Sequence, residues 1–439
     1  MEDELKGEVT RGAKALVVCP QIRGKPAQDP EARLEEAKGL ALAIGIVVAD
    51  AFVLPLREPR PATLFGAGQV ENIAAACEQN GAELVIVDGA LTAVQQRNLE
   101  ERFKRKVIDR TGLILEIFGE RAATAEGRLQ VELAHLDYQA GRLVRSWTHL
   151  ERQRGGFGFL GGPGETQIEA DRRMIRDRMA KIRRELEQVR RTRGLHRGRR
   201  EKAPWPVVAL VGYTNAGKST LFNRLTGADV MAEDLLFATL DPTMRAIRLP
   251  GVEKAILSDT VGFISDLPTQ LVAAFRATLE EVTAADIILH VRDIANPDSD
   301  GQKDEVLAIL GDLDVVDEAG ANPKVPIIEV WNKWDLLPES RQDELKLAMV
   351  SRPDEAIVPV SALTGLGCDG LLRTISTKLT ADSRVYEFVV PASDGMRLAF
   401  LHARGDVLNE NEAGEGDEGP MLRLRVRLSP MEFGRYSSL

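Results

Sequence analysis

Residues 207–220 read VVALVGYTNAGKST, and this run constrains the fold more than any other part of the 439-residue chain. Its first five residues predict a buried strand, and the LFNRL that follows predicts a helix. The turn between them matches the phosphate-binding pattern G-x-x-x-x-G-K-[ST] in the strand–loop–helix setting that this pattern requires. Lys218 would place a cation on the β- and γ-phosphates of a nucleotide, and Ser219 would offer a hydroxyl to Mg²⁺.

A second motif selects the base. Asn332-Lys333-Trp334-Asp335 follows an apolar strand, at the place where a parallel sheet presents its carboxyl edge. The Asp335 carboxylate can accept hydrogen bonds from N1–H and the exocyclic amine of guanine, and adenine has no donor at either position. We expect Asn332 to tie this loop to the phosphate loop. The backbone of Ser361-Ala362-Leu363 can offer an N–H to the guanine oxygen, so a guanine-nucleotide site is predicted.

The segment between these motifs has the features of a nucleotide-sensing switch. Asp259-Thr260-Val261-Gly262 follows a predicted strand. Asp259 would hold Mg²⁺ through water, and the Gly262 N–H would sense the γ-phosphate. Thr239, within Phe237-Ala238-Thr239-Leu240-Asp241, is the first candidate for a second hydroxyl on Mg²⁺, and Thr243 is a competing candidate.

Two residues of this region predict how hydrolysis is controlled. Phe263 stands where many GTPases carry a glutamine that orients the attacking water. A phenyl ring cannot hydrogen-bond water, so we expect slow intrinsic hydrolysis that depends on a partner. Asn215 has two open interpretations. It could ligate a monovalent cation such as K⁺ that stabilises the transition state, or its amide could bond the backbone of the loop.

The rest of the chain predicts an α/β protein in four parts. Short apolar strands alternate with helical patterns before residue 120, which indicates a small parallel sheet. The apolar run 39–56 is interpreted as a helix end followed by a buried strand, not as a membrane span. The expected parts are an N-terminal α/β domain (1–120), a helical hairpin with a glycine-rich tip at about 155–164 and a basic linker from 190 (121–200), a P-loop GTPase domain (201–381) and a small α+β C-terminal domain (382–439).

The hairpin is predicted by two heptad seams of apolar residues, at 129–150 and 168–189. Between them, residues 155–164 hold six glycines and one proline, and neither helix can continue through this composition. The two helices would pack antiparallel and leave Phe157 and Phe159 at the tip. These rings could stack on splayed RNA bases, or they could cap the core of the hairpin.

Charge and cysteine content indicate the kind of partner and the cellular compartment of the protein. The net charge is −10, yet residues 172–202 hold 14 basic and four acidic side chains. This segment indicates either a focused nucleic-acid contact or a solvated helix face. The acidic run 410–418 is expected to be a solvated loop. Three cysteines without metal-ligand spacing and a charged N-terminus without an apolar signal predict a cytoplasmic protein, with a monomer as the default.

Together these motifs resemble those of the HflX family of translational GTPases over most of the chain. The most specific mark is Gly161-Gly162-Pro163-Gly164-Glu165-Thr166 at the hairpin tip. The resemblance implies GTP hydrolysis to GDP stimulated by ribosomes, with Mg²⁺ at Ser219 and Thr239 and with Lys218, Gly262 and Thr239 acting in catalysis. It also implies binding to the large ribosomal subunit, contact of the hairpin with ribosomal RNA, and splitting or rescue of stalled ribosomes. The implied nucleotide contacts are Gly212, Tyr213, Thr214, Asn215, Ala216, Gly217, Lys218, Ser219, Thr220, Phe237, Ala238, Thr239, Leu240, Asp241, Asp259, Thr260, Val261, Gly262, Asn332, Lys333, Trp334, Asp335, Ser361, Ala362 and Leu363.

One departure from the family pattern concerns a second nucleotide site. Gly66-Ala67-Gly68 is followed by Gln69, where the family usually has a lysine, so the cation expected of an ATP site is missing. Three other functions stay open at this point. They are a GTPase for ribosome assembly or RNA modification, a nucleotide-gated RNA-binding adaptor that barely hydrolyses GTP, and an ATP-driven RNA-remodelling enzyme.

Overall fold

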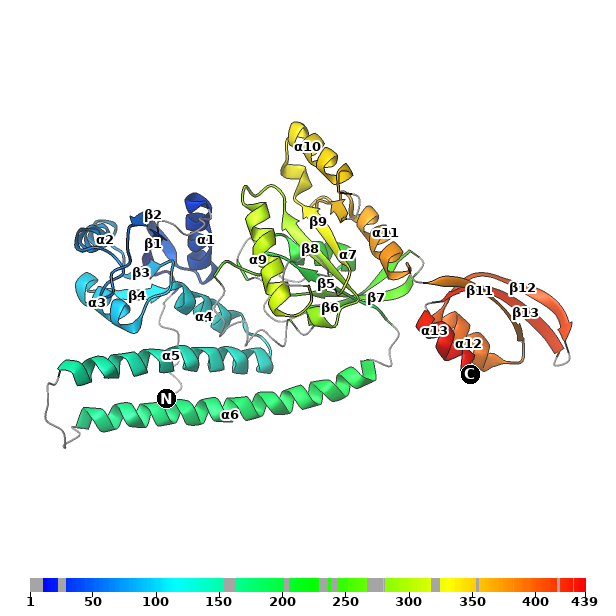
Figure 1. Ribbon diagram of the computed structural model, residues 1–439, viewed down its shortest axis with the longest axis horizontal. Helices are drawn as coiled ribbons and strands as arrows, with labels where there is room; N and C mark the ends of the chain where they lie inside the picture. Colours follow the sequence, from blue (N-terminus) through cyan, green and yellow to red (C-terminus); the bar gives the residue numbers. More distant parts are fainter. Residues whose placement is uncertain are drawn as a thin grey trace.

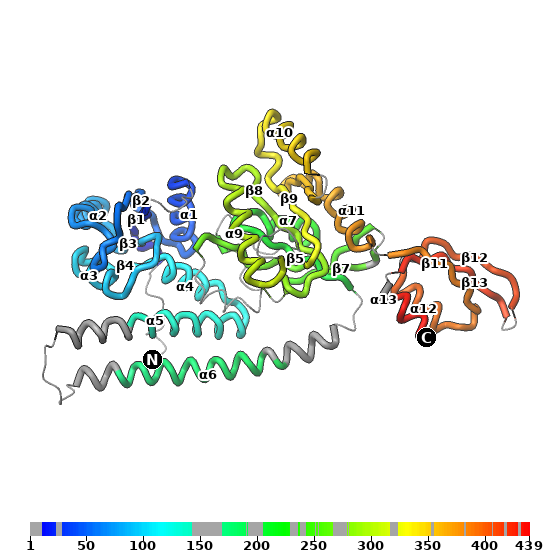
Figure 2. Tube along the Cα trace, in the orientation of Figure 1, coloured from blue at the N-terminus to red at the C-terminus, as the bar shows by residue number. Residues whose placement is uncertain are grey.

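The structure is a computed structural model that describes residues 11–22, 29–153, 163–200, 205–228, 236–237, 243–250, 252–266, 279, 281–316, 324–352, 355–381, 383–416, 419–428 and 430–439. These residues form three sheets and a pair of long helices (Figure 1). The chain runs from the N-terminal sheet through the helix pair and the largest sheet to a small C-terminal sheet (Figure 2). The predicted α/β fold class is confirmed.

The N-terminal sheet is parallel, with strand order β2-β1-β3-β4. Its elements are β1 (Lys14–Ile22), α1 (Pro30–Ala43), β2 (Val47–Leu56), α2 (Ala67–Asn80), β3 (Leu84–Val87), α3 (Ala93–Phe103), β4 (Lys106–Asp109) and α4 (Arg110–Arg121). The run 39–56 forms the end of α1 and then β2. However, β2 is an edge strand and is mostly half-buried, so the expectation of a buried strand was wrong. No helix in the described part of the chain is long and apolar enough to cross a membrane.

Gln69 has a structural role in this sheet. Its side-chain oxygen accepts from the backbone N–H of Gly66 at 3.0 Å, and its amide donates to the carbonyl of Pro55 at 3.0 Å. The side chain thus caps the N-terminus of α2 and ties it to the end of β2. The amide at this position serves the local fold.

The hairpin consists of α5 (Ala125–Gln153) and α6 (Pro163–Arg200), which lie side by side (Figure 1). Met179, Ile182 and Leu186 of the predicted α6 seam are buried, and Arg178 donates to both oxygens of Glu132 on α5 at 2.6 and 2.8 Å. Of the predicted tip, residues 155–162 lie outside the described residues. The predicted linker from residue 190 is instead helical to Arg200, because arginine is a good helix former and each interior glycine costs only about 1 kcal/mol.

The central sheet has the order β10-β9-β8-β5-β7-β6 and is parallel except for β6. Its elements are β5 (Val207–Val211), α7 (Lys218–Thr226), β6 (Thr243–Leu249), β7 (Val252–Asp259), β8 (Ile287–Asp293), α9 (Ser299–Asp312), β9 (Ile327–Asn332), the 3-10 turn η1 (Trp334–Leu336), α10 (Glu339–Val350), β10 (Ala356–Pro359) and α11 (Cys368–Leu379). β5 lies in the middle of this sheet and contributes to its apolar core. The loop after β5 lies at the carboxyl edge of the sheet, where parallel sheets bind ligands.

The C-terminal sheet is antiparallel, with order β11-β13-β12. It comprises β11 (Arg384–Pro391), α12 (Gly395–Arg404), β12 (Asp406–Gly416), β13 (Gly419–Leu428) and α13 (Pro430–Ser437). The expected acidic loop at 410–418 is therefore mostly strand, because β12 extends to Gly416. Its pairing with β13 overrides the weak strand propensity of glutamate and glycine.

Candidate functional site

The phosphate loop connects β5 to α7 and is held in shape by two close backbone approaches. A side chain at Gly212 would collide with the carbonyl of Val291, and one at Gly217, whose φ is +91°, would collide with the Asn332 amide. The Lys218 ammonium is buried and donates to the carbonyls of Gly212 (3.1 Å) and Tyr213 (2.7 Å). Burial lowers the pKa of Lys218 to about 8, although Asp259 opposes the shift. This arrangement presents a cation inside a ring of backbone groups, as phosphate binding requires.

Ser219 and Asp259 meet at the start of α7. The Ser219 hydroxyl donates to the Asp259 carboxylate at 2.8 Å, and Asp259 is fully buried at the end of β7. The described residues contain no group of three or more His, Cys, Asp or Glu side chains that could hold a metal. A hydroxyl beside a carboxylate is an oxygen donor set that fits Mg²⁺, which takes few protein ligands and completes its shell with phosphate and water.

Two threonines are candidates for the second hydroxyl that would bind Mg²⁺. Thr239 lies outside the described residues, together with Ala238, Leu240 and Asp241. Thr243 opens β6 and lies opposite Asp259 in register. Both candidates therefore stay predictions.

Gly262 lies directly against the phosphate loop. A Cβ at this position would stand 2.8 Å from the Thr214 methyl group and 3.0 Å from the Lys218 nitrogen. The next residue, Phe263, pairs its backbone with the loop, since Thr214 N–H donates to Phe263 O at 2.7 Å and Phe263 N–H donates to Gly212 O at 3.1 Å. Thr260 fixes the turn by donating to Leu210 O at 2.6 Å. The switch segment thus reaches the position from which a γ-phosphate could be sensed.

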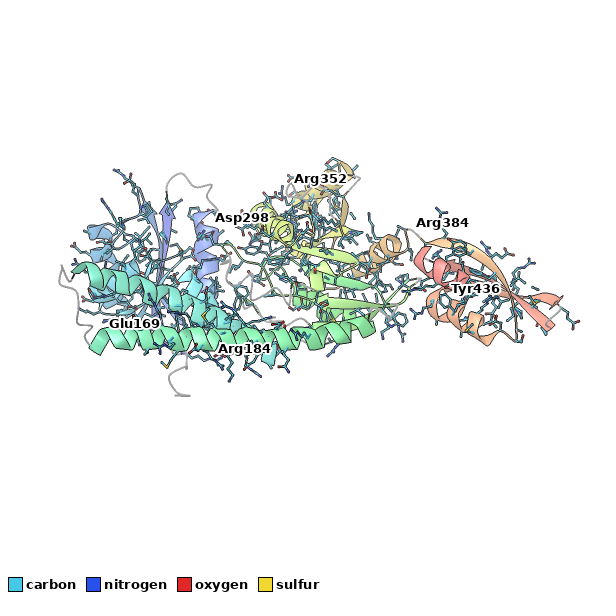
Figure 3. The ribbon with its side chains drawn as sticks, turned by 60° about the horizontal axis from the view of Figure 1, so that its bottom comes forward. Glu169, Arg184, Asp298, Arg352, Arg384 and Tyr436 are labelled. Carbon is cyan, nitrogen blue, oxygen red and sulfur yellow. The ribbon has the colours of Figure 1, made fainter. Side chains whose placement is uncertain are left out.

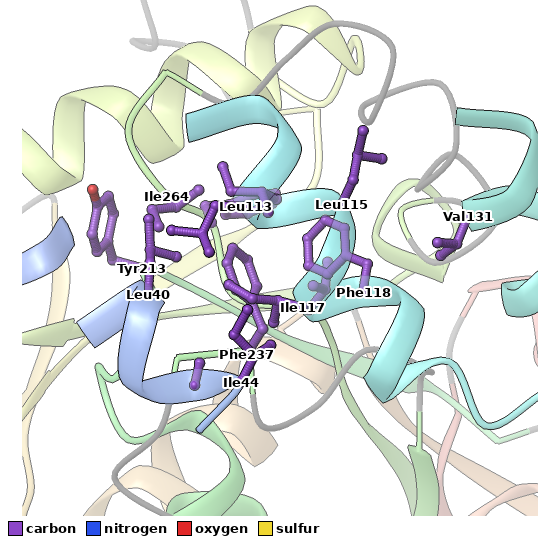
Figure 4. Packing of buried hydrophobic residues seen from close by; sticks show 14 of the residues in the cluster. Leu40, Ile44, Leu113, Leu115, Ile117, Phe118, Val131, Tyr213, Phe237 and Ile264 are labelled. Carbon is purple, nitrogen blue, oxygen red and sulfur yellow. The ribbon is translucent and has the colours of Figure 1, made fainter. Parts of the chain in front are cut away.

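The Phe263 side chain points into the protein. It is 1% exposed and belongs to the apolar cluster shared with Ile264, Tyr213 and the N-terminal sheet. Phe237 joins the same cluster, with its ring edge-on to Phe118 of α4 at 4.7 Å between centroids (Figure 4). The rings of Phe263 and Phe237 therefore belong to the contact between the two sheets. The surroundings of Phe237 are those of a residue that packs in an apolar core.

The loop that carries Asn332 and Asp335 is connected to the phosphate loop by the Asn332 side chain. Its amide donates to Ala216 O at 2.8 Å, and its side-chain oxygen accepts from the N–H of Ala362 at 2.9 Å. Lys333, at φ +61°, pairs with Asp293 at 2.7 Å, while Asp335 stands exposed in η1. A buried amide thus holds three loops together beside an exposed carboxylate.

The loop after β10 is also fixed from within. The N–H of Ser361 donates to Leu366 O at 2.9 Å, and the N–H of Ala362 donates to Asn332. Arg224 of α7 donates to the carbonyls of Ala362 and Leu363. Of the three residues proposed to reach the guanine oxygen, Leu363 is the most exposed, at 71%.

A buried polar cluster joins the phosphate loop to the N-terminal sheet. The Tyr213 hydroxyl donates to the Glu36 carboxylate of α1 and accepts from the N–H of Ser265 at 2.7 Å. The Ser265 hydroxyl donates to the same carboxylate at 2.7 Å. Burial and then the charge of Glu36 raise the pKa of the Tyr213 phenol well above its usual range, so the hydroxyl stays protonated.

Arg110 anchors this cluster from the other side. It is 3% exposed, pairs with Asp88 and Glu36, and donates to Ser265 O at 2.9 Å. Arg33 extends the network by pairing with Asp88 and Asp266 at 2.7 Å each. Burial disfavours the Arg110 charge, but Asp88 and Glu36 raise its pKa beyond the usual value. The buried charges thus come from the N-terminal unit, and Tyr213 and Ser265 of the central unit complete their hydrogen bonds.

Comparison with known proteins gives the family. Three family models match in sequence order: "GTP-binding GTPase N-terminal" over 31–119, "GTP-binding GTPase Middle Region" over 121–200 and "50S ribosome-binding GTPase" over 207–333. The GTPase HflX of Magnetococcus marinus is 50% identical over 92% of this chain and 89% of its own. The chain belongs to the HflX family of GTPases. HflX of Escherichia coli is 42% identical over 92% of this chain and 91% of its own.

Among solved structures, a GTP-binding protein of Sulfolobus solfataricus in complex with GDP is similar over 84% of this chain and 99% of that one, with 24% identity and a TM-score of 0.46. The family assignment rests on the HflX relatives, which cover most of both chains. The third family model ends at residue 333, within the Asn332–Asp335 motif, and the C-terminal sheet lies beyond it.

In this HflX-family chain, sequence reasoning missed the cluster of Glu36, Arg110 and Asp88. The strand order, which the structure supplies, points to its place in the fold. The strand order places the reversal of the N-terminal sheet between β1 and β3, and such switch points form a crevice at the carboxyl edge. Asp88 directly follows β3, so it lies at that crevice. Near this edge, Arg110 donates to Ser265 O, and Glu36 accepts from the Tyr213 hydroxyl.

Proposed function

We propose that this chain is a Mg²⁺-dependent GTPase that binds the large ribosomal subunit, is activated by it, and splits or rescues stalled ribosomes. The observation that carries the proposal is that Ser219 bonds the phosphate loop to Asp259 of the switch segment, while Asn332 bonds the phosphate loop to the loop that presents the exposed Asp335. The match of residues 207–333 to a family described as a 50S ribosome-binding GTPase supports the partner.

In this proposal each residue near the nucleotide has one task. Lys218 neutralises the β- and γ-phosphates, and the Gly262 N–H faces the γ-phosphate. Ser219 and Thr239 are the residues that would hold Mg²⁺, with Asp259 behind them through water, and the ion would supply positive charge to the phosphate oxygens. Asp335 selects guanine, and the backbone of 361–363 contacts its oxygen. Asn215, exposed in the loop with φ +58°, is the candidate ligand for K⁺.

The hairpin is the proposed contact with ribosomal RNA. Several α6 side chains are exposed and basic, among them Arg173, Arg176, Arg183 and Arg184, and Figure 3 labels Arg184 on this helix. Clustered arginines attract the phosphate backbone and make binding dependent on salt. The tip aromatics Phe157 and Phe159 lie outside the described residues, and we propose that they stack on RNA bases.

The test measures the splitting of intact ribosomes after GTP or GDP is added. Splitting is monitored by light scattering and by sedimentation. We expect splitting with GTP only, and at least a tenfold slower rate for Phe157→Ala/Phe159→Ala. Met174→Ala is the matched control, because Met174 is an apolar side chain of the same hairpin that is 63% exposed on α6. A tip variant as active as the control would contradict the role of the tip.

Two further measurements, of binding to ribosomal particles and of hydrolysis, separate two of the other functions. Tighter binding to immature particles than to mature subunits would favour an assembly GTPase. Nucleotide-dependent binding without any stimulated hydrolysis would favour the adaptor.

A further inference from the structure

The C-terminal sheet is the part of the chain that the proposed function leaves without a role. One of its faces is covered by α12 and α13, whose apolar side chains pack on the sheet. The stacked rings of Tyr386 and Phe433, 4.1 Å apart, belong to this contact. The core between the sheet and these helices consists of Phe388, Val390, Leu401, Leu424, Val426 and Leu428.

The opposite face carries three arginines on the central strand. Because side chains alternate along a strand, Arg423, Arg425 and Arg427 of β13 stand on the face away from the helices. Arg423 and Arg425 are exposed and Arg427 is half-buried. The flanking Val385 and Val389 of β11 are 44% and 51% exposed, so no described element covers this face.

The remaining positions of this face, which we call the arginine face, are two valines, two asparagines and two acidic residues. Asn409 and Asn411 of β12 lie opposite Arg425 and Arg423 in register, and both are exposed. Glu387 pairs with Arg423 at 3.3 Å, and Asp406 occupies the register position opposite Arg427. The arginine face therefore has three arginines against two carboxylates, and the arginines and asparagines supply many donors.

Two acidic side chains of β12 belong to the other side of the sheet. Glu410 and Glu412 lie opposite Leu424 and Leu422, which belong to the helix-covered side, and Glu410 contacts His402 of α12 at 3.2 Å. Residues 383–439 hold seven arginines and no lysine. The three aligned arginines outnumber the two carboxylates of the arginine face, and this favours an anionic partner there.

We propose that the arginine face binds the phosphodiester backbone of RNA as a second contact, separate from the hairpin. Arginine presents a planar fork of donors that grips a phosphate bidentately, which lysine does not. Alternate residues of a strand stand about 6.7 Å apart, similar to the spacing of successive phosphates in an RNA strand. The face has no aromatic side chain among its described positions, so the contact reads the backbone and not the bases. That the RNA is ribosomal rests on the proposed function.

The experiment compares three versions of the full-length chain. The test variant is Arg423→Gln/Arg425→Gln/Arg427→Gln. The matched control is Arg384→Gln/Arg397→Gln/Arg435→Gln, which removes the same charge from the same sheet and its helices but not from the arginine face. Thermal unfolding checks that all three fold. Dissociation constants are measured for protein-free large-subunit RNA and for purified large subunits, over about 50 to 200 mM salt.

We expect the test variant to bind both probes at least tenfold more weakly at the lower salt. Its slope of log affinity against log salt should fall by roughly two, since three single-strand phosphate contacts are lost. The control should stay within twofold of the parent, and GTP hydrolysis without ribosomes should be unchanged in both.

Three results would overturn the proposal or locate its failure. Equal affinities and slopes for the parent and the test variant would refute the arginine face. A loss on intact subunits without any loss on protein-free RNA would show that the face binds a protein instead. If the parent itself does not bind subunits, the proposed ribosomal function fails, and the RNA titration still decides whether the arginine face binds RNA.

Discussion

The Tyr213 hydroxyl donates a hydrogen bond to the Glu36 carboxylate and so joins the phosphate loop to α1 of the N-terminal sheet. Ser265, three residues after Gly262, donates to the same carboxylate. The Glu36 side chain of α1 thus contacts both the loop that would hold the phosphates and the segment that would sense the γ-phosphate. A change in the position of the N-terminal sheet would reach the nucleotide site through these bonds.

The variant Tyr213→Phe tests this bond. It removes one donor from a nearly buried carboxylate, and leaving such a group short of a partner costs about 1–3 kcal/mol. We expect a lower thermal midpoint for unfolding of the parts containing the N-terminal and central sheets. Tyr436→Phe, in the C-terminal sheet unit labelled in Figure 3, is the control for the same chemical change. Equal midpoints for the two variants would show that the bond contributes nothing.

Phe263→Gln should not create a faster GTPase. Phe263 is 1% exposed within the apolar cluster, so glutamine there would bury an amide and lose ring contacts, at a cost of about 3 kcal/mol or more. We expect lower stability and less than a twofold gain in single-turnover hydrolysis, whereas Phe263→Leu should retain most of the stability. A tenfold faster glutamine variant of unchanged stability would mean that this side chain reaches the attacking water.

Asp335→Asn should exchange the base preference. The amide can donate to the second carbonyl of xanthine, while the N1–H and amine of guanine lose their charged acceptor. We expect about 100-fold weaker binding of GDP and tighter binding of xanthosine diphosphate. Both affinities are measured by fluorescence titration. Asp343→Asn, an exposed change on α10, is the control. An unaltered affinity for GDP would show that Asp335 does not contact the guanine base.

Glu305 of α9 should make the stability of this region depend on pH. Burial, with repulsion from Glu36, Asp266 and Asp298, raises the pKa of Glu305 from 4.5 to about 7, and Arg110 opposes the shift. The folded state therefore holds this proton more tightly than the unfolded state, so stability falls as pH rises from about 4.5 through 7. Glu305→Gln mimics the protonated form.

We expect Glu305→Gln to melt at a higher temperature than the parent at pH 8, and at nearly the same temperature at pH 5. Glu58→Gln, an exposed glutamate in the N-terminal sheet unit, should give no such pH-dependent difference. A gap between Glu305→Gln and the parent that does not change with pH would assign the effect to packing.

Local sequence patterns were sufficient for much of this fold. The strand and loop at 207–220 and the strand before Asn332 appear where the sequence predicts them, because each depends on neighbouring residues. The Tyr213–Glu36 bond could not be predicted in this way, since the two residues are 177 positions apart and meet only when two sheets pack. The direction of the Phe263 ring depends on the same packing. The four domain boundaries and the roles of the individual site residues stay predictions.

The most direct test of the central claim is the rate of GTP hydrolysis with and without purified large ribosomal subunits, at two salt concentrations. The account predicts a large stimulation that weakens as salt rises, because a partner completes the active site and basic side chains hold it to RNA. An unstimulated rate at both salt concentrations would contradict the account.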